Sequence, residues 1–233
     1  MSSTISIIIP VKNEAAQLPV LLHYLNAIPG KAHIAEIIVS DGKSTDDTVQ
    51  IANLYGAKVV LSEQAGRGRQ MNAGAKSATG NILYFLHADS IPPTGFVEDI
   101  LDSINAGNVA GCYRLRFDDD HWFLKANAWF TRFNVNAVRF GDQSLFVNKS
   151  VFETIGCFRE DLIIMEDQEI IHRIRAQGRF AVIEDYVTTS ARKYKVNGIY
   201  RMQGIFFYIY FAYLLGASQQ KLVSIYKKLI RSS

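Results

Sequence analysis

The sequence predicts an α/β protein built on a largely parallel sheet, and three observations lead to this prediction. Short apolar runs rich in β-branched residues alternate with helix-like segments through residues 5–105. This alternation is typical of right-handed β-α-β units. The alternation becomes less regular after Asn108, and an uncharged aromatic segment follows at residues 204–217. We therefore expect a parallel, nucleotide-binding-like first half, a less regular second half and a C-terminal helical tail.

The strands predicted in the first half are continuous apolar runs that end in Gly, Pro, Asp or another polar residue. They cover residues 5–10, 34–40, 57–61 and 81–86. A run without polar alternation is buried on both faces, so each is expected inside a parallel sheet. The run 81–86 leads directly into His87-Ala88-Asp89.

The helices predicted between these strands have apolar residues at a spacing of three and four positions. They cover residues 14–27, 48–55, 66–78 and 96–105. We expect Asn13 to cap the first of them, because Asn is a favoured N-cap residue. Ser44, with an acid three residues later, is expected to cap the second.

The second half is predicted to continue the same domain with less regular elements. Its strands are expected at residues 109–117, 142–148 and 180–183, and its helices at 121–134 and 166–177. We place the domain at residues 1–195, with a first half at 1–107 and a second at 108–195. Residues 196–233 are assigned to the helical tail.

Composition restricts the class of protein. A chain of 233 residues can bury the core of one large domain. Its two cysteines are far apart in the sequence and form no Cys-x-x-Cys pattern, which argues against a disulfide framework and a structural zinc site. The N-terminus carries no signal-peptide pattern, so we expect a cytoplasmic protein.

The tail is basic and aromatic. Eight Lys or Arg and no Asp or Glu lie after Asp185, whereas the rest of the chain holds 17 basic and 22 acidic residues. Residues 204–217 are too few to cross a bilayer, which needs about 20. Three roles stay open for this segment: a buried helix, a homodimer contact, or an interfacial helix on the anionic inner face of the cell membrane.

Four short polar motifs follow predicted strands or open a late helix. They are Pro10-Val11-Lys12-Asn13-Glu14, the segment 41–46, His87-Ala88-Asp89 and Glu166-Asp167. Ligands bind beyond the carboxyl ends of strands in open α/β sheets. His87 and Asp89 are two positions apart and can face one ion or phosphate together. A turn or a helix cap explains each motif alone, but the four in this order indicate a site.

This set of motifs resembles the inverting family 2 glycosyltransferases, which have the GT-A fold. The resemblance implies a three-layer α/β/α nucleotide-binding fold with a mixed, mostly parallel sheet. The residues that carry the resemblance are Pro10-x-x-Asn13-Glu14, Asp41-Gly42-x-Ser44-Thr45-Asp46, Ala88-Asp89 and Glu166-Asp167. The resemblance covers about residues 5–190. Residues 66–74 and 140–143 are similar to a branch of small, single-domain bacterial members, some of which are assigned to the glycosylation of carotenoid-type lipids.

The resemblance implies a nucleoside-diphosphate sugar donor, with UDP as the expected nucleotide, bound by the first half of the domain. The residues expected to bind the donor are Pro10, Asn13, Glu14, Asp41, Gly42, Arg67, Arg69, Asn72, His87, Ala88 and Asp89. Asp142, Gln143 and Arg192 are assigned to the acceptor or diphosphate side. Asp167 is implied as the general base, and Glu166 is expected to orient the segment or to raise the basicity of Asp167.

The resemblance also implies a divalent cation, Mn²⁺ or Mg²⁺, held by Asp89. His87 stands where the family pattern Asp-x-Asp has its first Asp. His is a ligand for Mn²⁺ but a poor one for Mg²⁺, so we favour packing or phosphate contact for His87 over metal ligation.

Two alternatives to this enzyme remain open. A nucleotide-sugar-binding protein without catalysis, recruited to membranes by the tail, has no need of a base at Asp167. A nucleotidylyltransferase usually has a Gly-rich basic loop after its first strand, where this chain has Pro10-Val11-Lys12-Asn13-Glu14. The expected acceptor is a hydroxyl or carboxyl of a lipid-like or small molecule, and no nucleic-acid partner is expected.

Overall fold

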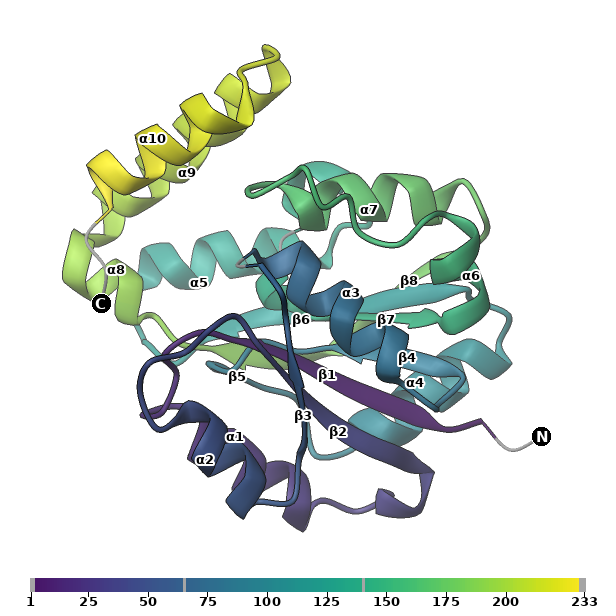
Figure 1. The fold of residues 1–233 in the computed structure, drawn as a ribbon. Helices are drawn as coiled ribbons and strands as arrows, with labels where there is room; N and C mark the ends of the chain where they lie inside the picture. Colours follow the sequence, from purple (N-terminus) through teal and green to yellow (C-terminus); the bar gives the residue numbers. More distant parts are fainter. Residues whose placement is uncertain (1–2, 65, 140, 231–233) are drawn as a thin grey trace.

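The computed structural model describes residues 3–64, 66–139 and 141–230, which form one eight-stranded sheet flanked by helices (Figure 1). The strand order is β3-β2-β1-β4-β7-β6-β8-β5. The strands are β1 (Ile5–Val11), β2 (Ile34–Asp41), β3 (Lys58–Leu61), β4 (Ile82–Phe85), β5 (Ser90–Ile91), β6 (Ala110–Phe117), β7 (Leu145–Asn148) and β8 (Phe180–Thr189).

The sheet is mixed and mostly parallel, as the sequence predicts. Strands β1 to β4 form the parallel part, in which β1 pairs with both β2 and β4 and β2 pairs with β3. Strand β7 is antiparallel to β4 and to β6, whereas β6 and β8 pair in parallel. Because β7 joins β4 to β6, one sheet continues across both halves of the domain.

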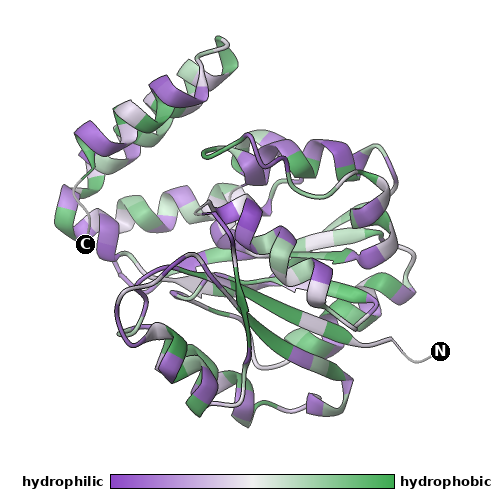
Figure 2. Ribbon diagram, in the orientation of Figure 1, coloured by the Kyte–Doolittle hydropathy of each residue, from purple (hydrophilic) through white to green (hydrophobic). Residues whose placement is uncertain are grey.

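Helices cover both faces of the sheet, which gives the expected three layers. Apolar residues of α1 (Leu18–Ala27), α2 (Thr48–Leu54) and α4 (Phe96–Asn105) pack on one face. Those of α3 (Arg67–Ser77), α6 (Lys149–Thr154) and α7 (Glu166–Arg175) pack on the other. The strands between them are largely hydrophobic, as Figure 2 shows. The fold-class prediction is therefore confirmed.

The first helix starts later than predicted, and Asn13 does not cap it. Helix α1 begins at Leu18, and Gln17, at its N-cap position, makes no side-chain cap. Asn13 has a left-handed backbone with φ 56°, and its Oδ1 accepts a hydrogen bond of 2.8 Å from the backbone N–H of Thr45. A contact across two loops has replaced the local cap, which sequence spacing cannot reveal.

Ser44 is also not the cap of the second helix. Its Oγ accepts from the backbone N–H of Asn13 at 2.9 Å. Helix α2 begins at Thr48, whose N–H donates to Oδ1 of Asp46 at 3.1 Å. The two loops that follow β1 and β2 are thus joined by hydrogen bonds in both directions.

Elements of the second half differ from prediction in length. The strand expected from residue 142 begins at Leu145, because Gly141–Gln143 form a 3-10 turn, η4. Helix α5 covers only Trp122–Trp129 and continues as the 3-10 turn η2, Phe130–Arg132. Strand β8 extends to Thr189 because it pairs with β6 as far as Phe117. Further 3-10 turns are η1 (Lys31–His33) and η3 (Asn136–Val138).

Helix α8 (Arg192–Asn197) leads from the domain into the tail, whose helices α9 (Ile199–Leu214) and α10 (Gln219–Leu229) form a hairpin (Figure 1). One side of α9 packs inward, where Ile205 and Ile209 are buried with Leu222 of α10. Phe207 and Phe211 on the same helix are exposed. Segment 204–217 therefore has one buried side and one free side. Within residues 3–64, 66–139 and 141–230, no helix is long and apolar enough to cross a bilayer.

Candidate active site

The carboxyl ends of the central parallel strands bring the predicted motifs together. Val11 of β1 is paired with Asp41 of β2, and β4 on the other side of β1 leads into His87. Asp41 is only 2% exposed, and its carboxylate accepts from the backbone N–H of Ser44 at 3.0 Å. It lies at a pocket of about 650 Å³ whose lining comprises Asp41, Lys43, Ser44, Val49, Leu61, Ser62 and Glu63.

Glu14, Asp89 and Arg192 form a charged group at this edge. The Arg192 guanidinium lies 3.8 Å from Oε2 of Glu14. Burial and the nearby negative charge of Asp89 raise the pKa of Glu14, while Arg192 and Lys193 act in the opposite direction. The backbone C=O of Asp89 accepts from the N–H of Ser190 at 3.1 Å, which connects the end of β4 to the chain before α8. Carboxylates and cations therefore face one another here, an arrangement suited to a metal–diphosphate group.

His87 is paired with Asp142, which lies on the η4 turn. Its Nδ1 is 3.1 Å from Oδ1 of the carboxylate, and His87 is 12% exposed. An ionised carboxylate can only accept, so the ring donates through Nδ1. Partial burial opposes ionisation of Asp142, but the hydrogen bond and charge of His87, with Lys193 and Arg67, lower its pKa below the usual range.

Asp167, the predicted base, lies against the same turn. Its Oδ2 accepts from the backbone N–H of Gly141 at 2.5 Å, and its Oδ1 accepts from the N–H of Gln168 at 2.8 Å. A Cβ added at Gly141 would lie 3.1 Å from Oδ2 of Asp167 and 3.0 Å from Cε1 of His87. The turn thus joins the end of β4 to the start of α7.

Glu166, which precedes Asp167 in the chain, is buried and paired with Arg67 at the start of α3. It is 3% exposed, and its Oε1 lies 3.6 Å from the Arg67 guanidinium. Burial raises the pKa of Glu166 to about 7, a rise that Asp167 increases and Arg67 opposes. Loss of hydration lowers the pKa of Arg67, but the charges of Glu166, Asp142 and Asp167 raise it above the usual value. Arg67 is therefore ion-paired with Glu166 and stabilised by the charges of Asp142 and Asp167, with 42% of its side chain exposed.

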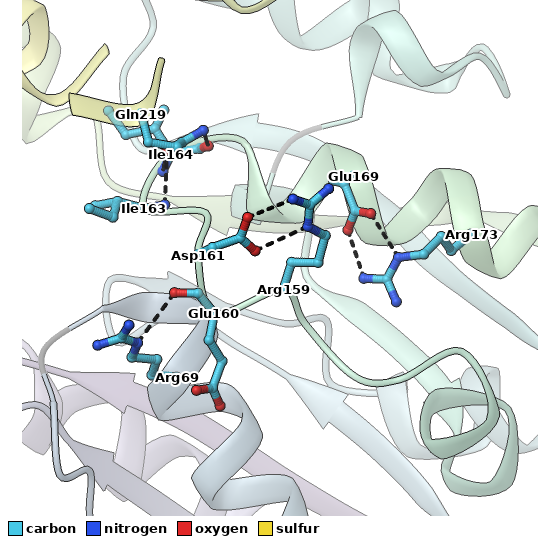
Figure 3. Close-up of polar contacts among 9 residues, drawn as sticks. All are labelled: Arg69, Arg159, Glu160, Asp161, Ile163, Ile164, Glu169, Arg173 and Gln219. Atoms are coloured by element: carbon cyan, nitrogen blue, oxygen red, sulfur yellow. Dashed lines mark hydrogen bonds and ion pairs between the residues drawn. The ribbon is translucent and has the colours of Figure 1, made fainter. Parts of the chain in front are cut away.

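Three predicted site residues hold the surrounding chain. Arg69 donates to the backbone C=O of Glu160 at 3.3 Å, as Figure 3 shows. Asn72 donates to the C=O of Phe158 and accepts from its N–H, both at 2.9 Å. Gln143 is fully buried and donates to the C=O of Tyr113 at 3.0 Å. In this structure the three side chains bond to backbone groups of neighbouring segments.

Gln70 is a structural part of the site that the sequence predictions missed. Its side-chain amide donates to the C=O of Val11 at 2.6 Å and of Ser40 at 3.0 Å. A Cβ on Gly42 would lie 2.8 Å from this amide, so Gly42 is required by close packing. Gln70 lies inside the segment 66–74, directly after Arg69 and two positions before Asn72, and this position was the available signal.

Pro10 and Ala88 complete the predicted positions. Pro10 is paired with Ser40 within the parallel sheet, and Ala88 is 6% exposed between His87 and Asp89. The alternation leaves His87 and Asp89 less buried than Ala88. His87 to Ser90 form a turn, in which the N–H of Ser90 donates to the C=O of His87 at 3.1 Å, so this segment is not the extended chain for which the two-residue spacing was argued.

The described residues at the carboxyl edge of the sheet offer few side chains that could bind a metal ion. Among the described residues, no three His, Cys, Asp or Glu side chains are close enough to hold an ion by themselves. Mg²⁺ and related ions are often bound through one or two carboxylates, with substrate phosphates completing the shell. Asp89, beside Glu14, fits that second arrangement because its donor is a hard oxygen.

Comparison with known proteins identifies relatives among the glycosyltransferases. A PGL/p-HBAD biosynthesis glycosyltransferase of Mycobacterium bovis is 38% identical over 207 residues, which are 83% of this chain and 77% of that protein. An undecaprenyl-phosphate 4-deoxy-4-formamido-L-arabinose transferase of Aeromonas hydrophila is 28% identical over 166 residues, 67% of this chain and 46% of that protein. An uncharacterised glycosyltransferase of Mycobacterium tuberculosis is 31% identical over 103 residues, and this match spans less than half of either protein (44% of each).

Solved structures share the fold at low sequence identity. Staphylococcus aureus TarS 1–349 in complex with UDP-GlcNAc has a TM-score of 0.69 and 21% identity, over 80% of this chain and 58% of that chain. A Pyrobaculum calidifontis mannosyltransferase with GDP-Man and Mn²⁺ has a TM-score of 0.67 and 17% identity, over 81% and 57%. The fold is that of the GT-A glycosyltransferases.

The family model for glycosyl transferase family 2 matches residues 6–159, which include the ends of β1, β2 and β4 and the η4 turn. The match extends over more than half of the chain, and it contains most of the charged groups that meet at the carboxyl edge of the sheet. On the combined strength of that match, the fold and the relatives, this chain belongs to glycosyl transferase family 2.

Proposed function

We propose that this protein is an inverting glycosyltransferase that moves a sugar from a nucleoside-diphosphate sugar, with UDP as the expected nucleotide, to an acceptor hydroxyl or carboxyl. The observation that carries the proposal is that three segments meet: the chain after β4, the η4 turn and the start of α7. His87 bonds to Asp142 at 3.1 Å, and Gly141 bonds to Asp167 at 2.5 Å. The base, the end of β4 and the predicted diphosphate side are thereby held around one point.

The donor is proposed to lie along the ends of β1, β2 and β4. The pocket beside Asp41 has the size and the polar acceptors to take the base and ribose. Arg67 and Arg192, with exposed fractions of 42% and 33%, are the cations placed to meet the diphosphate. A divalent cation, when bound by Asp89, would supply electrostatic stabilisation of the departing diphosphate.

Asp167 is proposed to act as the general base. It takes the proton of the acceptor hydroxyl while that oxygen forms a bond to the anomeric carbon and the bond from that carbon to the diphosphate oxygen breaks. Displacement from the opposite face inverts the configuration, and the electron pair leaves with the nucleoside diphosphate. The hydrogen bonds from Gly141 and Gln168 fix the carboxylate, which favours a single attack geometry.

The acceptor is proposed to be lipid-linked, and the tail is proposed to meet an anionic membrane surface on its inner face. The Aeromonas relative is named an undecaprenyl-phosphate transferase, which supports a lipid-linked acceptor.

The exposed side of helix α9 supports the proposed membrane contact. Helix α9 exposes Phe207, Tyr208, Phe211 and Leu214. Lys193, Lys195, Lys221, Lys227 and Lys228 lie on the neighbouring segments. Aromatic residues and lysines favour the headgroup region of a bilayer. A homodimer through the same face is the competing outcome.

Calorimetry and turnover test this function together. We expect one of UDP, GDP and dTDP to bind, and to bind more tightly with Mn²⁺. Replacing the base in Asp167→Asn should lower turnover by about 10²- to 10⁴-fold while leaving nucleotide binding intact. Absence of binding by every nucleotide would contradict the proposal. Binding without turnover in the wild-type protein would instead favour a nucleotide-sugar-binding protein.

A further inference from the structure

The loop that leads to Glu166 and Asp167 is held by the C-terminal hairpin through one side chain. Gln219, the first residue of α10, accepts through Oε1 from the backbone N–H groups of Ile163 and Ile164 at 3.0 and 3.1 Å. Its Nε2 donates to the C=O of Ile164 at 3.2 Å. Figure 3 shows this amide lying over the loop, so one side chain satisfies three backbone groups.

Apolar packing joins the hairpin to the loop at the same place. Ile164 packs against the cluster formed by Ile205, Ile209 and Leu222 of α9 and α10. The hydrogen bonds of Gln219 are therefore not isolated surface contacts. They add to a contact between the loop and the hairpin that is already formed by apolar side chains.

The opposite side of the loop is held by helix α3. Asn72 bonds to both backbone groups of Phe158, and Arg69 bonds to the C=O of Glu160. The loop between Phe158 and Ile164 is consequently anchored at its start by the helix that carries Arg67 and at its end by α10. Figure 3 shows Arg69 and Gln219 at opposite ends of this stretch.

The residue that follows this anchor has an uncommon backbone conformation. Met165 has φ 71°, a left-handed conformation that L residues seldom adopt, and it immediately precedes Glu166 and Asp167. Such residues persist where the surrounding structure fixes them on both sides. Met165 is followed by α7 and preceded by Ile164, whose backbone is bonded to Gln219. Met165 is therefore fixed between the first turn of α7 and the backbone that Gln219 holds.

We propose that Gln219 is a positioning residue for the transfer reaction: by fixing Ile163 and Ile164 it sets the turn at Met165 and thereby the location of the Asp167 carboxylate. This inference rests on the proposed function of Asp167 as the base. Gln219 touches no substrate in this role. Its effect passes through the loop backbone. The pocket beside Asp41 is lined by residues between Asp41 and Glu63, and neither the loop nor Gln219 contributes to that lining.

The test compares Gln219→Ala with Gln220→Ala, in which the neighbouring, exposed glutamine of the same helix is truncated. We expect Gln219→Ala to lower kcat by about 10-fold, because small displacements of a catalytic group are costly, and to leave the donor Kd unchanged. Gln220→Ala should behave as the wild type. Gln219→Glu keeps the two acceptor bonds and loses the donor, so its kcat should lie between those of Gln219→Ala and the wild type.

Amide hydrogen exchange supplies a readout that does not depend on activity. The N–H groups of Ile163 and Ile164 should exchange faster in Gln219→Ala and keep their protection in Gln220→Ala. Unchanged kcat in Gln219→Ala, or an equal fall in both alanine variants, would overturn the inference. An absence of transfer by the wild-type protein would overturn the proposed function instead, so the two failures are distinguishable.

Discussion

Gly141 lies close to both His87 and Asp167, and a side chain there would crowd both of them. A Cβ would lie 3.0 Å from Cε1 of His87 and 3.1 Å from the carboxylate of Asp167. Both neighbours are held by hydrogen bonds, so neither can move freely. The absence of a side chain at this position lets an acid and an imidazole approach from opposite sides.

We expect Gly141→Ala to reduce turnover by about 10-fold or more while nucleotide binding is retained, because the added methyl displaces Asp167, the proposed base. Steady-state kinetics and calorimetry on the same preparation measure the two quantities. Gly95→Ala is the matched control, since a Cβ there meets no atom within 4 Å. Wild-type turnover in Gly141→Ala would show that the position of Asp167 is not critical.

Glu166 should make stability depend on pH. Burial raises its pKa from 4.5 to about 7, so between these values the folded protein holds a proton that the unfolded chain has released. The free energy of unfolding therefore falls as pH rises through this range and levels off above it.

Glu166→Gln removes this dependence. Relative to the wild type, the variant should gain up to about 3 kcal/mol at pH 8 and little at pH 5. Urea unfolding at the two pH values measures the difference. An equal effect of the substitution at both would mean that Glu166 titrates near its usual value when folded.

At the scale of elements, α3 connects the sheet, the donor edge and the loop before α7. Gln70 bonds to the ends of β1 and β2, Asn72 holds Phe158, and Arg67 is paired with Glu166. These side chains come from fewer than two turns of one helix. The approach of α3 to β1 is close, because a Cβ on Gly74 would lie 2.5 Å from Cγ2 of Ile8.

Gly74→Ala should therefore destabilise the protein by about 1–3 kcal/mol through overpacking, although alanine is the better helix former. Gly204→Ala is the matched substitution, because Gly204 also lies within a helix and a Cβ there meets nothing within 4 Å. That variant should gain up to about 1 kcal/mol. Chemical unfolding of both decides the point, and a stabilised Gly74→Ala would mean that α3 can shift away from β1.

At the scale of the whole molecule, the tail has two different faces. Met202 and Ile209 are buried, whereas Phe207 is 49% and Phe211 is 59% exposed. The buried side connects the tail to the domain through Leu124, Ala191 and Tyr194. The exposed side is free to contact lipid or a second copy of the chain.

The double substitution Phe207→Ser and Phe211→Ser should leave the fold intact and abolish co-flotation with anionic liposomes, because it removes apolar area that would enter the headgroup region. Leu54→Ser, on α2, changes an apolar side chain that is 83% exposed and should have no effect on flotation. A loss of dimer in gel filtration, with no flotation by the wild type, would assign this face to self-association.

The sequence by itself determined the alternation of strands and helices in the first half of the domain and the order of the motifs. These follow from local apolar periodicity and from polar residues placed directly after buried strands. The family resemblance came from the order and spacing of the motifs that contain Glu14, Asp41, Asp89 and Asp167.

Only the tertiary structure decided which residues meet. The pairing of Asn13 with Thr45, the closeness of Gly141 to Asp167 and the contact of Gln219 with Ile164 join positions far apart in the sequence. The full length of β8 was set by its partner β6. Hydrogen bonds of this kind depend on the packing of whole elements, and local periodicity carries no information about them.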